Sequence, residues 1–300
     1  MIYRLSLLAF MAVTQFAFYS TRRFPDELKR RIQDTLSKHP GVFAVALKDL
    51  ASGEEILINE HTVFHAASTM KVPVMIEVYK QAAAGKFALS ESVPLKFTFR
   101  SIVDSSEFTL DPEEDSDQTL YRSAGVSNQV PLSDLVELMI TRSSNLATNI
   151  VIELVNAQNV TQTMRALGAK DIQVLRGVED DKAFQKGLNN TTTAYDLMLI
   201  FEKIAQGKAV NAAASEEMVN ILLKQEFNDV IPARLPDDVK VAHKTGEISG
   251  VRHDAGIVFL PDGRRYVLVL LSKEVKDVPK AVEAMATVSE MIYQYIKESK

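Results

Sequence analysis

The chain contains no cysteine, and this absence removes several kinds of chemistry at once. Disulfide bonds, thiolate metal sites and cysteine nucleophiles are all excluded. Basic residues are also too few to favour nucleic acid as a partner. The 34 Lys and Arg stand against 39 Asp and Glu, and no basic cluster is interleaved with aromatic residues. No metal or other cofactor is expected either, because the closely spaced pair His61 and His65 has no third ligand nearby.

Long apolar runs are equally scarce, and the one near the N-terminus is too short to span a bilayer comfortably. It extends from Leu5 to Phe18, with Arg4 before it and polar residues after it. A short apolar run behind a basic residue is typical of a secretory signal peptide. We therefore predict a signal peptide over residues 1–20 and a periplasmic or secreted protein. An uncleaved membrane anchor and a buried first helix are the alternatives.

The remaining sequence has the composition of a globular protein with a substantial core, since 46% of its 300 residues are hydrophobic. Turn signals and apolar periodicity divide it into elements of different types. Strands are expected at both ends of the chain, over residues 42–50, 55–59, 239–245, 255–260 and 266–272. Helices are expected over residues 25–37, 68–85, 132–141, 145–156, 191–205 and 279–298.

These elements predict an α/β (α+β) fold. The economical assembly is a three-layer α-β-α sandwich, in which one five-stranded antiparallel sheet is built from both termini and an all-helical domain is inserted. We expect a discontinuous α/β domain over residues 24–62 and 228–300, and a helical domain over residues 63–227. The helical domain contains an acidic segment, residues 97–125, which is expected to be a solvated surface loop.

The first motif that can carry chemistry is S-x-x-K, from Ser68 to Lys71. Ser68 is expected to begin a helix, so that its N–H and the helix N-terminus point at the group it attacks. Lys71 follows three residues later on the same helix face. A serine hydroxyl becomes a strong nucleophile only when a base takes its proton, and a lysine can do so if its pKa falls. Alone, this pattern would also fit a helix-capping serine and a solvated lysine.

Two further motifs follow in order. Ser143-Ser144-Asn145 lies at an expected break between helices, where Ser143 could pass a proton to a leaving group. Asn145 could bind a substrate amide through both a donor and an acceptor, and Asn149 lies one turn further on the same face. Helix capping would explain the same residue types.

The third motif is Lys244-Thr245-Gly246, at the end of an expected strand. Gly246 would permit close approach of a substrate backbone, and the N–H of Glu247 could join that of Ser68 in an oxyanion hole. Lys244, Thr245 and Arg252 together could bind a substrate carboxylate, the arginine through a bidentate fork.

The three motifs in this order resemble those of class A β-lactamases and penicillin-binding proteins. The chain is similar to β-lactamase-related serine hydrolases from about residue 26 to its C-terminus. The resemblance implies that Ser68 is the nucleophile, Lys71 the base or proton relay, and Ser143 the proton shuttle. It also implies that Asn145 binds the amide carbonyl, while Lys244, Thr245 and Arg252 hold the carboxylate. We expect no cofactor and a monomeric protein.

The chain departs from the family pattern at two functional positions. Ser144 replaces the Asp of S-D-N, and the omega-like loop, residues 175–190, lacks the family's E-x-x-L-N. Glu179 is the nearest candidate for the deacylating glutamate, and Asn149 would help to orient the water. A rival reading pairs Glu179 with Lys182 or leaves it in solvent.

Three functions are therefore consistent with the sequence. The first is a β-lactamase that opens β-lactam amides through an acyl-enzyme on Ser68. The second is a D-Ala-D-Ala carboxypeptidase, or another penicillin-binding serine amidase or esterase, acting on a peptidoglycan-like substrate with slow deacylation. The third is a penicillin sensor that stays acylated. Membrane association is expected only if the N-terminal segment is not cleaved.

Overall fold

The computed structural model describes residues 25–299, apart from residues 114 and 124–127. The signal peptide predicted over residues 1–20 lies outside this part of the chain. Within it, no helix combines the length and apolar character needed to cross a membrane.

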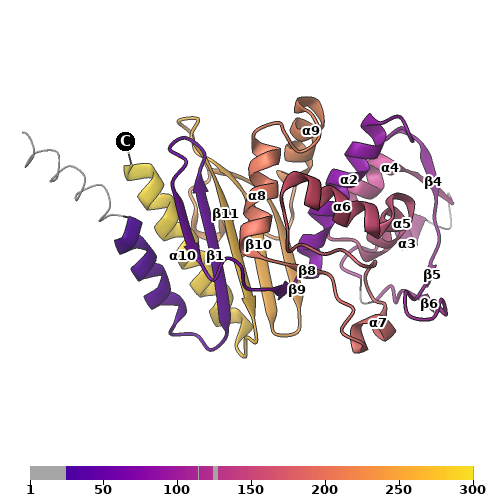
Figure 1. Cartoon of the computed structure of the whole chain (residues 1–300), viewed down its shortest axis with the longest axis horizontal. Coiled ribbons are helices and arrows are strands. Elements are labelled where there is room, and N and C mark those ends of the chain that lie inside the picture. The colour runs from indigo at the N-terminus through magenta and orange to yellow at the C-terminus, as the bar shows by residue number, and fades with distance from the viewer. Residues whose placement is uncertain (1–24, 114, 124–127, 300) are drawn as a thin grey trace, which may run out of the picture.

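One five-stranded antiparallel sheet is built from both ends of the chain, as the sequence predicts (Figure 1). The register joins β1 to β2 and to β11, while β10 lies between β11 and β9. The outermost strand, β9, therefore has one edge that faces other elements of the molecule. In sheet order the strands are β2 (Glu55–Ile58), β1 (Val42–Asp49), β11 (Arg265–Lys273), β10 (Val251–Phe259) and β9 (Lys240–Ile248).

The sheet is the middle of three layers. A helix over residues 25–36 and helix α10 (Val278–Glu298) cover one face, and helix α8 (Ala194–Ala205) lies on the other (Figure 1). Side chains on a strand point alternately to opposite faces, so β11 contributes to two hydrophobic cores. Val267, Val269 and Leu271 pack in the core beneath α8, whereas Tyr266, Leu268 and Leu270 pack in the core beneath α10. The predicted three-layer sandwich is confirmed.

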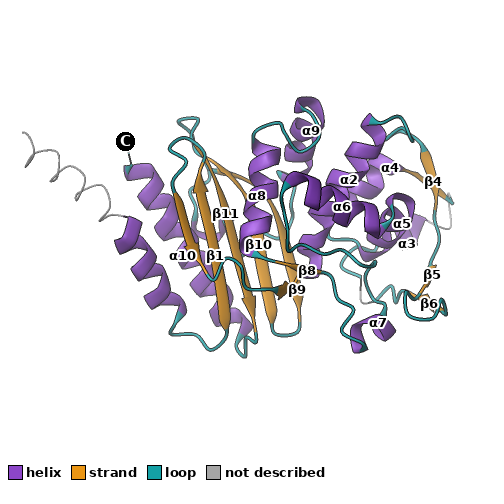
Figure 2. Cartoon of the chain, viewed as in Figure 1, coloured by secondary structure: helices purple, strands orange, loops and turns teal. Residues whose placement is uncertain are grey.

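Helices form the middle of the chain, on the α8 side of the sheet (Figure 2). The expected helices are α2 (Lys71–Ala83), α4 (Leu132–Thr141) and α5 (Asn145–Val155). The structure adds α6 (Ala157–Leu167) and α9 (Ala212–Leu222), together with short helices α3 (Thr119–Ser123) and α7 (Asp181–Gln185) and the 3₁₀ turn η2 (Pro232–Arg234). The division into two domains stays a prediction.

Three small ribbons complete the fold. β3 (Phe64–His65) pairs with β8 (Thr191–Thr192), so the helix expected over residues 191–205 begins only at Ala194. β4 (Ser92–Pro94) pairs with β7 (Gln129–Pro131), and β5 (Thr98–Arg100) pairs with β6 (Glu107–Thr109). The β5–β6 ribbon places part of the acidic segment in regular structure.

Candidate active site

Ser68 lies at the point where the helical part meets the edge of the sheet. It is half-buried in the 3₁₀ turn η1 (Ala67–Met70), so the prediction that it begins the α-helix is wrong by one turn. Gly246 of β9 packs directly against this turn, since a Cβ there would lie 3.2 Å from the Ser68 nitrogen. A larger residue would force β9 away from the nucleophile. Gly246 therefore matters for the close approach of two protein segments, in addition to any substrate.

A buried histidine ties the segment before Ser68 to the sheet. Nε2 of His253 lies 2.9 Å from the His65 carbonyl oxygen, while Nδ1 lies 2.9 Å from the Arg252 carbonyl oxygen and 3.2 Å from the Ser272 nitrogen. Burial lowers the pKa of His253 to about 4, so the ring stays neutral. Nδ1 of His65 in turn accepts from the Ala67 N–H. In the described part of the chain, no group of acidic or histidine side chains could hold a metal ion.

Lys71 is the first residue of α2 and is completely buried. Its Nζ donates to the Ser143 carbonyl at 2.6 Å, to Ser143 Oγ at 3.1 Å and to Asn145 Oδ1 at 2.9 Å. Burial lowers the pKa of Lys71 to about 7, although the charges of Asp115 and Glu179 raise it. A lysine with this pKa exists partly as the neutral amine near pH 7, which is what a base requires.

Ser143 joins the first and third motifs. Its Oγ accepts hydrogen bonds from the Nζ of Lys71 and the Nζ of Lys244, each at 3.1 Å. Lys244 is fully buried, and burial together with the charges of Lys71 and Arg252 lowers its pKa. Its Nζ also donates to the Thr245 carbonyl. Ser143 has a φ of 59°, a strained conformation for a residue with a side chain, and such strain often marks functional positions.

The second motif occupies the predicted break between α4 and α5. Ser144 caps α5, since its Oγ accepts from the Ala147 N–H. Asn145 faces the site and connects two candidate catalytic groups. Its Oδ1 accepts from Lys71, and its Nδ2 donates to Glu179 Oε1 at 2.5 Å. The backbone break therefore orients the first and third residues of the motif, while the middle residue stabilises the helix.

The omega-like loop directs Glu179 toward these residues. Its half-buried side chain accepts from Asn145 and raises the pKa of Lys71. Glu179 has a φ of 60°, again in the left-handed region. Lys182, the rival partner, pairs instead with Asp104. The structure thus favours the reading in which Glu179 belongs to the site.

Asn149 has a different position from the one expected. Its Nδ2 donates to the Val178 carbonyl at 3.0 Å, and its Oδ1 accepts from the Val178 N–H at 2.7 Å. A Cβ at Gly177 would lie only 2.1 Å from this Oδ1, so the loop backbone passes very close to the side chain. Asn149 fixes the backbone next to Glu179. Both polar atoms of its side chain contact the loop, and its role in binding substrate or water stays a prediction.

Arg252 is not free to form the predicted fork with a substrate carboxylate. One terminal nitrogen donates to Glu247 and the other to Asp229. The register sets Arg252 directly opposite Glu247 on the paired strands β10 and β9. Glu247 was predicted to act only through its N–H, yet its carboxylate forms an ion pair with the Arg252 guanidinium.

The family was identified from the whole chain. The model of the β-lactamase enzyme family matches residues 27–296. This chain belongs to that family. It is 23% identical to the extended-spectrum β-lactamase PER-1 of Pseudomonas aeruginosa, over 95% of this chain and 92% of PER-1. The structure of PBP-A is 30% identical with a TM-score of 0.76, over 91% of this chain and 96% of PBP-A. A PBP-A mutant solved as an acyl-enzyme complex with penicillin G is 29% identical, with a TM-score of 0.75 and coverage of 91% and 97%.

Within this β-lactamase-family site, the sequence analysis missed Asp115. The acidic segment was expected to be solvated, but Asp115 is only 6% exposed. Its carboxylate accepts from the N–H groups of Asn145 and Leu146, the first residues of α5, and from the Tyr121 hydroxyl. The absence of the Asp of S-D-N, where Ser144 stands, was the one signal that a carboxylate had to come from elsewhere.

We expect Asp115→Ala to lower the free energy of unfolding by about 1–2 kcal/mol, the usual cost of losing a helix cap. Asp111→Ala, in an exposed part of the same segment, is the matched control and should change stability by less than about 0.5 kcal/mol. Urea denaturation of both variants and of wild type measures these free energies of unfolding. Equal stabilities for the two variants would contradict the capping role.

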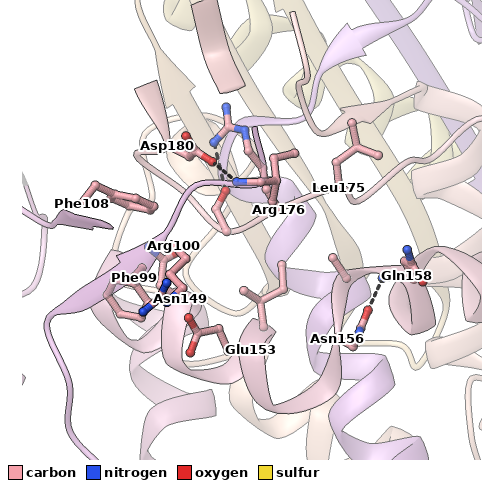
Figure 3. Close-up of a pocket in the computed structure, with 14 residues that line it drawn as sticks. Phe99, Arg100, Phe108, Asn149, Glu153, Asn156, Gln158, Leu175, Arg176 and Asp180 are labelled. Atoms are coloured by element: carbon pink, nitrogen blue, oxygen red, sulfur yellow. Dashed lines mark hydrogen bonds between the residues drawn. The ribbon is translucent and has the colours of Figure 1, made fainter. Parts of the chain in front are cut away.

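A separate pocket of about 280 Å³ lies behind the omega-like loop (Figure 3). Phe99 and Phe108 of the β5–β6 ribbon line it together with Asn149, which lies beside Phe99, and Arg176 of the omega-like loop. Ser68, the candidate nucleophile, is not among its lining residues. This pocket is therefore distinct from the candidate active site, although both share the loop that carries Glu179.

Proposed function

We propose that this protein is a serine β-lactamase that opens β-lactam amides through an acyl-enzyme on Ser68. The observation that supports this most strongly is the hydroxyl of Ser143, which accepts hydrogen bonds from two buried lysines, Lys71 and Lys244, beside the turn that carries Ser68. Such a network can move a proton from a nucleophile to a leaving nitrogen. Similarity to PER-1 and to the penicillin G complex of a PBP-A mutant supports the same substrate class.

Acylation then has four parts. The Ser68 oxygen attacks the lactam carbonyl carbon while its proton passes to the neutral amine of Lys71. The backbone N–H groups of Ser68 and Glu247 would stabilise the negative charge on the carbonyl oxygen. The carbon–nitrogen bond breaks, and Ser143 delivers a proton to the nitrogen. Ser143 regains a proton from Lys71, which returns to its neutral form, so the acyl-enzyme forms with no net loss or gain of protons.

We expect the acylation rate to rise with pH through about 7 and then to level. The neutral amine of Lys71 is the base, and its pKa is about 7, so raising the pH through this value increases the active fraction. Stopped-flow acylation by a chromogenic β-lactam between pH 5 and 9 measures the profile. Asp115→Asn should shift the midpoint downward, because the Asp115 charge raises the pKa of Lys71. A rate that shows no midpoint near pH 7 and is still rising at pH 9 would contradict this assignment.

The experiment that tests the function is a penicillin pulse followed by intact-mass measurements over time. A β-lactamase forms an adduct of one acyl group and loses it rapidly as hydrolysed product appears. An adduct that persists for hours would favour the penicillin-binding peptidase or the sensor. A chain that forms no adduct would exclude all three functions.

We further propose that the protein is exported. The support is the sequence of residues 1–20, with a basic residue followed by a short apolar run. N-terminal sequencing of the protein from a periplasmic or secreted fraction tests the proposal. Recovery of the uncleaved chain in the membrane fraction would favour the anchor instead.

A further inference from the structure

The carboxylate-binding arginine of the candidate site is already occupied by two carboxylates of the chain itself. Arg252 is almost completely buried, with 9% of its side chain exposed. Its two terminal nitrogens donate to Glu247 and Asp229, and its buried Nε has no hydrogen-bond partner among the residues that the structure describes. Both terminal nitrogens that would bind a substrate carboxylate therefore already donate to carboxylates of the protein.

Arg252, Glu247 and Asp229 form a cluster of charges that lies close to the third motif. Glu247 and Thr245 lie two residues apart on β9, so their side chains share one face of the sheet, and Arg252 pairs opposite Glu247 on that face. The Arg252 charge lowers the pKa of Lys244, so the guanidinium is close enough to interact electrostatically with the third motif. β9 is an edge strand, and its Gly246 contacts the Ser68 segment, so Glu247 and its partner Arg252 lie next to the part of β9 that borders the nucleophile.

The two carboxylates differ from the arginine in exposure. Glu247 is 61% exposed and Asp229 is 49% exposed, so each can leave Arg252 for solvent while the arginine stays in place. Two carboxylates beside one guanidinium also give the cluster a net formal charge of −1. A substrate carboxylate arriving here must displace one of them and is repelled by the other.

We infer that Glu247 determines substrate specificity by masking Arg252, which disfavours substrates with a carboxylate at this position and favours those with a neutral or cationic group. This inference rests on the proposed acyl-enzyme function and names the substrate class of the same site. The contribution of an ion pair with one exposed member is modest. Its effect appears as a selectivity between substrates, and stability need not change.

The test compares benzylpenicillin with its methyl ester, which differ in one negative charge. We expect Glu247→Gln to raise kcat/KM for the acid relative to the ester by roughly threefold to tenfold. The substitution keeps the backbone N–H and the length of the side chain, so the predicted oxyanion donor remains. Glu283→Gln is the matched control, because Glu283 is 64% exposed and pairs with a different arginine, Arg234. It should leave the ratio unchanged.

A second variant shows whether the effect passes through Arg252. In an Arg252→Gln background, Glu247→Gln should give no gain in the acid-to-ester ratio. A gain that persists there, or an unchanged ratio in the single variant, would overturn the inference. Failure of the proposed function would look different, since wild type would then form no acyl adduct with either compound or would keep the adduct for hours.

Discussion

Ser68→Ala is expected to abolish covalent labelling by penicillin and to reduce β-lactam turnover by a factor on the order of 10⁶, the scale of loss when a serine hydrolase loses its nucleophile. The physical reason is the setting of the Ser68 hydroxyl group. Ser68 is half-buried beside β9. It lies one turn before Lys71, whose neutral amine is the proposed base. Intact-mass measurement after a penicillin pulse detects the adduct directly.

The control for this experiment is Ser52→Ala. Ser52 is exposed in the turn between β1 and β2, donates to Asp49 and belongs to none of the three motifs. It should label and turn over like wild type. A Ser68→Ala protein that is folded and still acquires one acyl group would show that the nucleophile lies elsewhere and would remove the proposed mechanism.

The sheet could be predicted where its inner strands are apolar. Strand β11 alternates between two cores and is read easily from its sequence. Strand β10 was expected only from Ala255, yet it begins at Val251. Arg252, His253 and Asp254 are polar but buried, because each has a specific partner on a neighbouring element. Polar strand residues of this kind look like loop residues in a sequence.

The candidate site was predictable to the extent that its chemistry is local. Ser68, Lys71, Ser143 and Lys244 belong to short motifs, and the structure brings the last three together through hydrogen bonds. Asp115 was not predictable, because it acts on α5 from a segment 30 residues earlier in the chain. The masking of Arg252 by Asp229 was equally hidden, since the pair is separated by 23 residues.

Glu179→Gln is expected to acylate at nearly the wild-type rate but to release its product roughly 10²–10⁴-fold more slowly, the usual contribution of a general base. The carboxylate of Glu179 bonds to Asn145 and lies within electrostatic range of Lys71. It can therefore take a proton from a water that attacks the acyl-enzyme. The glutamine has the same shape but cannot accept that proton.

The same pulse experiment measures this step, because the slow variant accumulates the acyl adduct. Asp181→Asn is the matched control, because it removes the carboxylate of an exposed acidic residue two positions further along, in the first turn of α7. It should release product as fast as wild type. Rapid release by both variants would place the base elsewhere in the site.

The backbone around Glu179 supplies a second test of the same step. The left-handed conformation at Glu179 is maintained by Asn149, which bonds to both backbone groups of Val178. Asn149→Ala should therefore slow deacylation in the same direction as Glu179→Gln, by releasing the loop. Because Asn149 acts only through the position of Glu179, adding Asn149→Ala to the Glu179→Gln variant should slow product release little further. A full additive loss in the double variant would mean that Asn149 contacts the water or substrate directly, as the sequence first suggested.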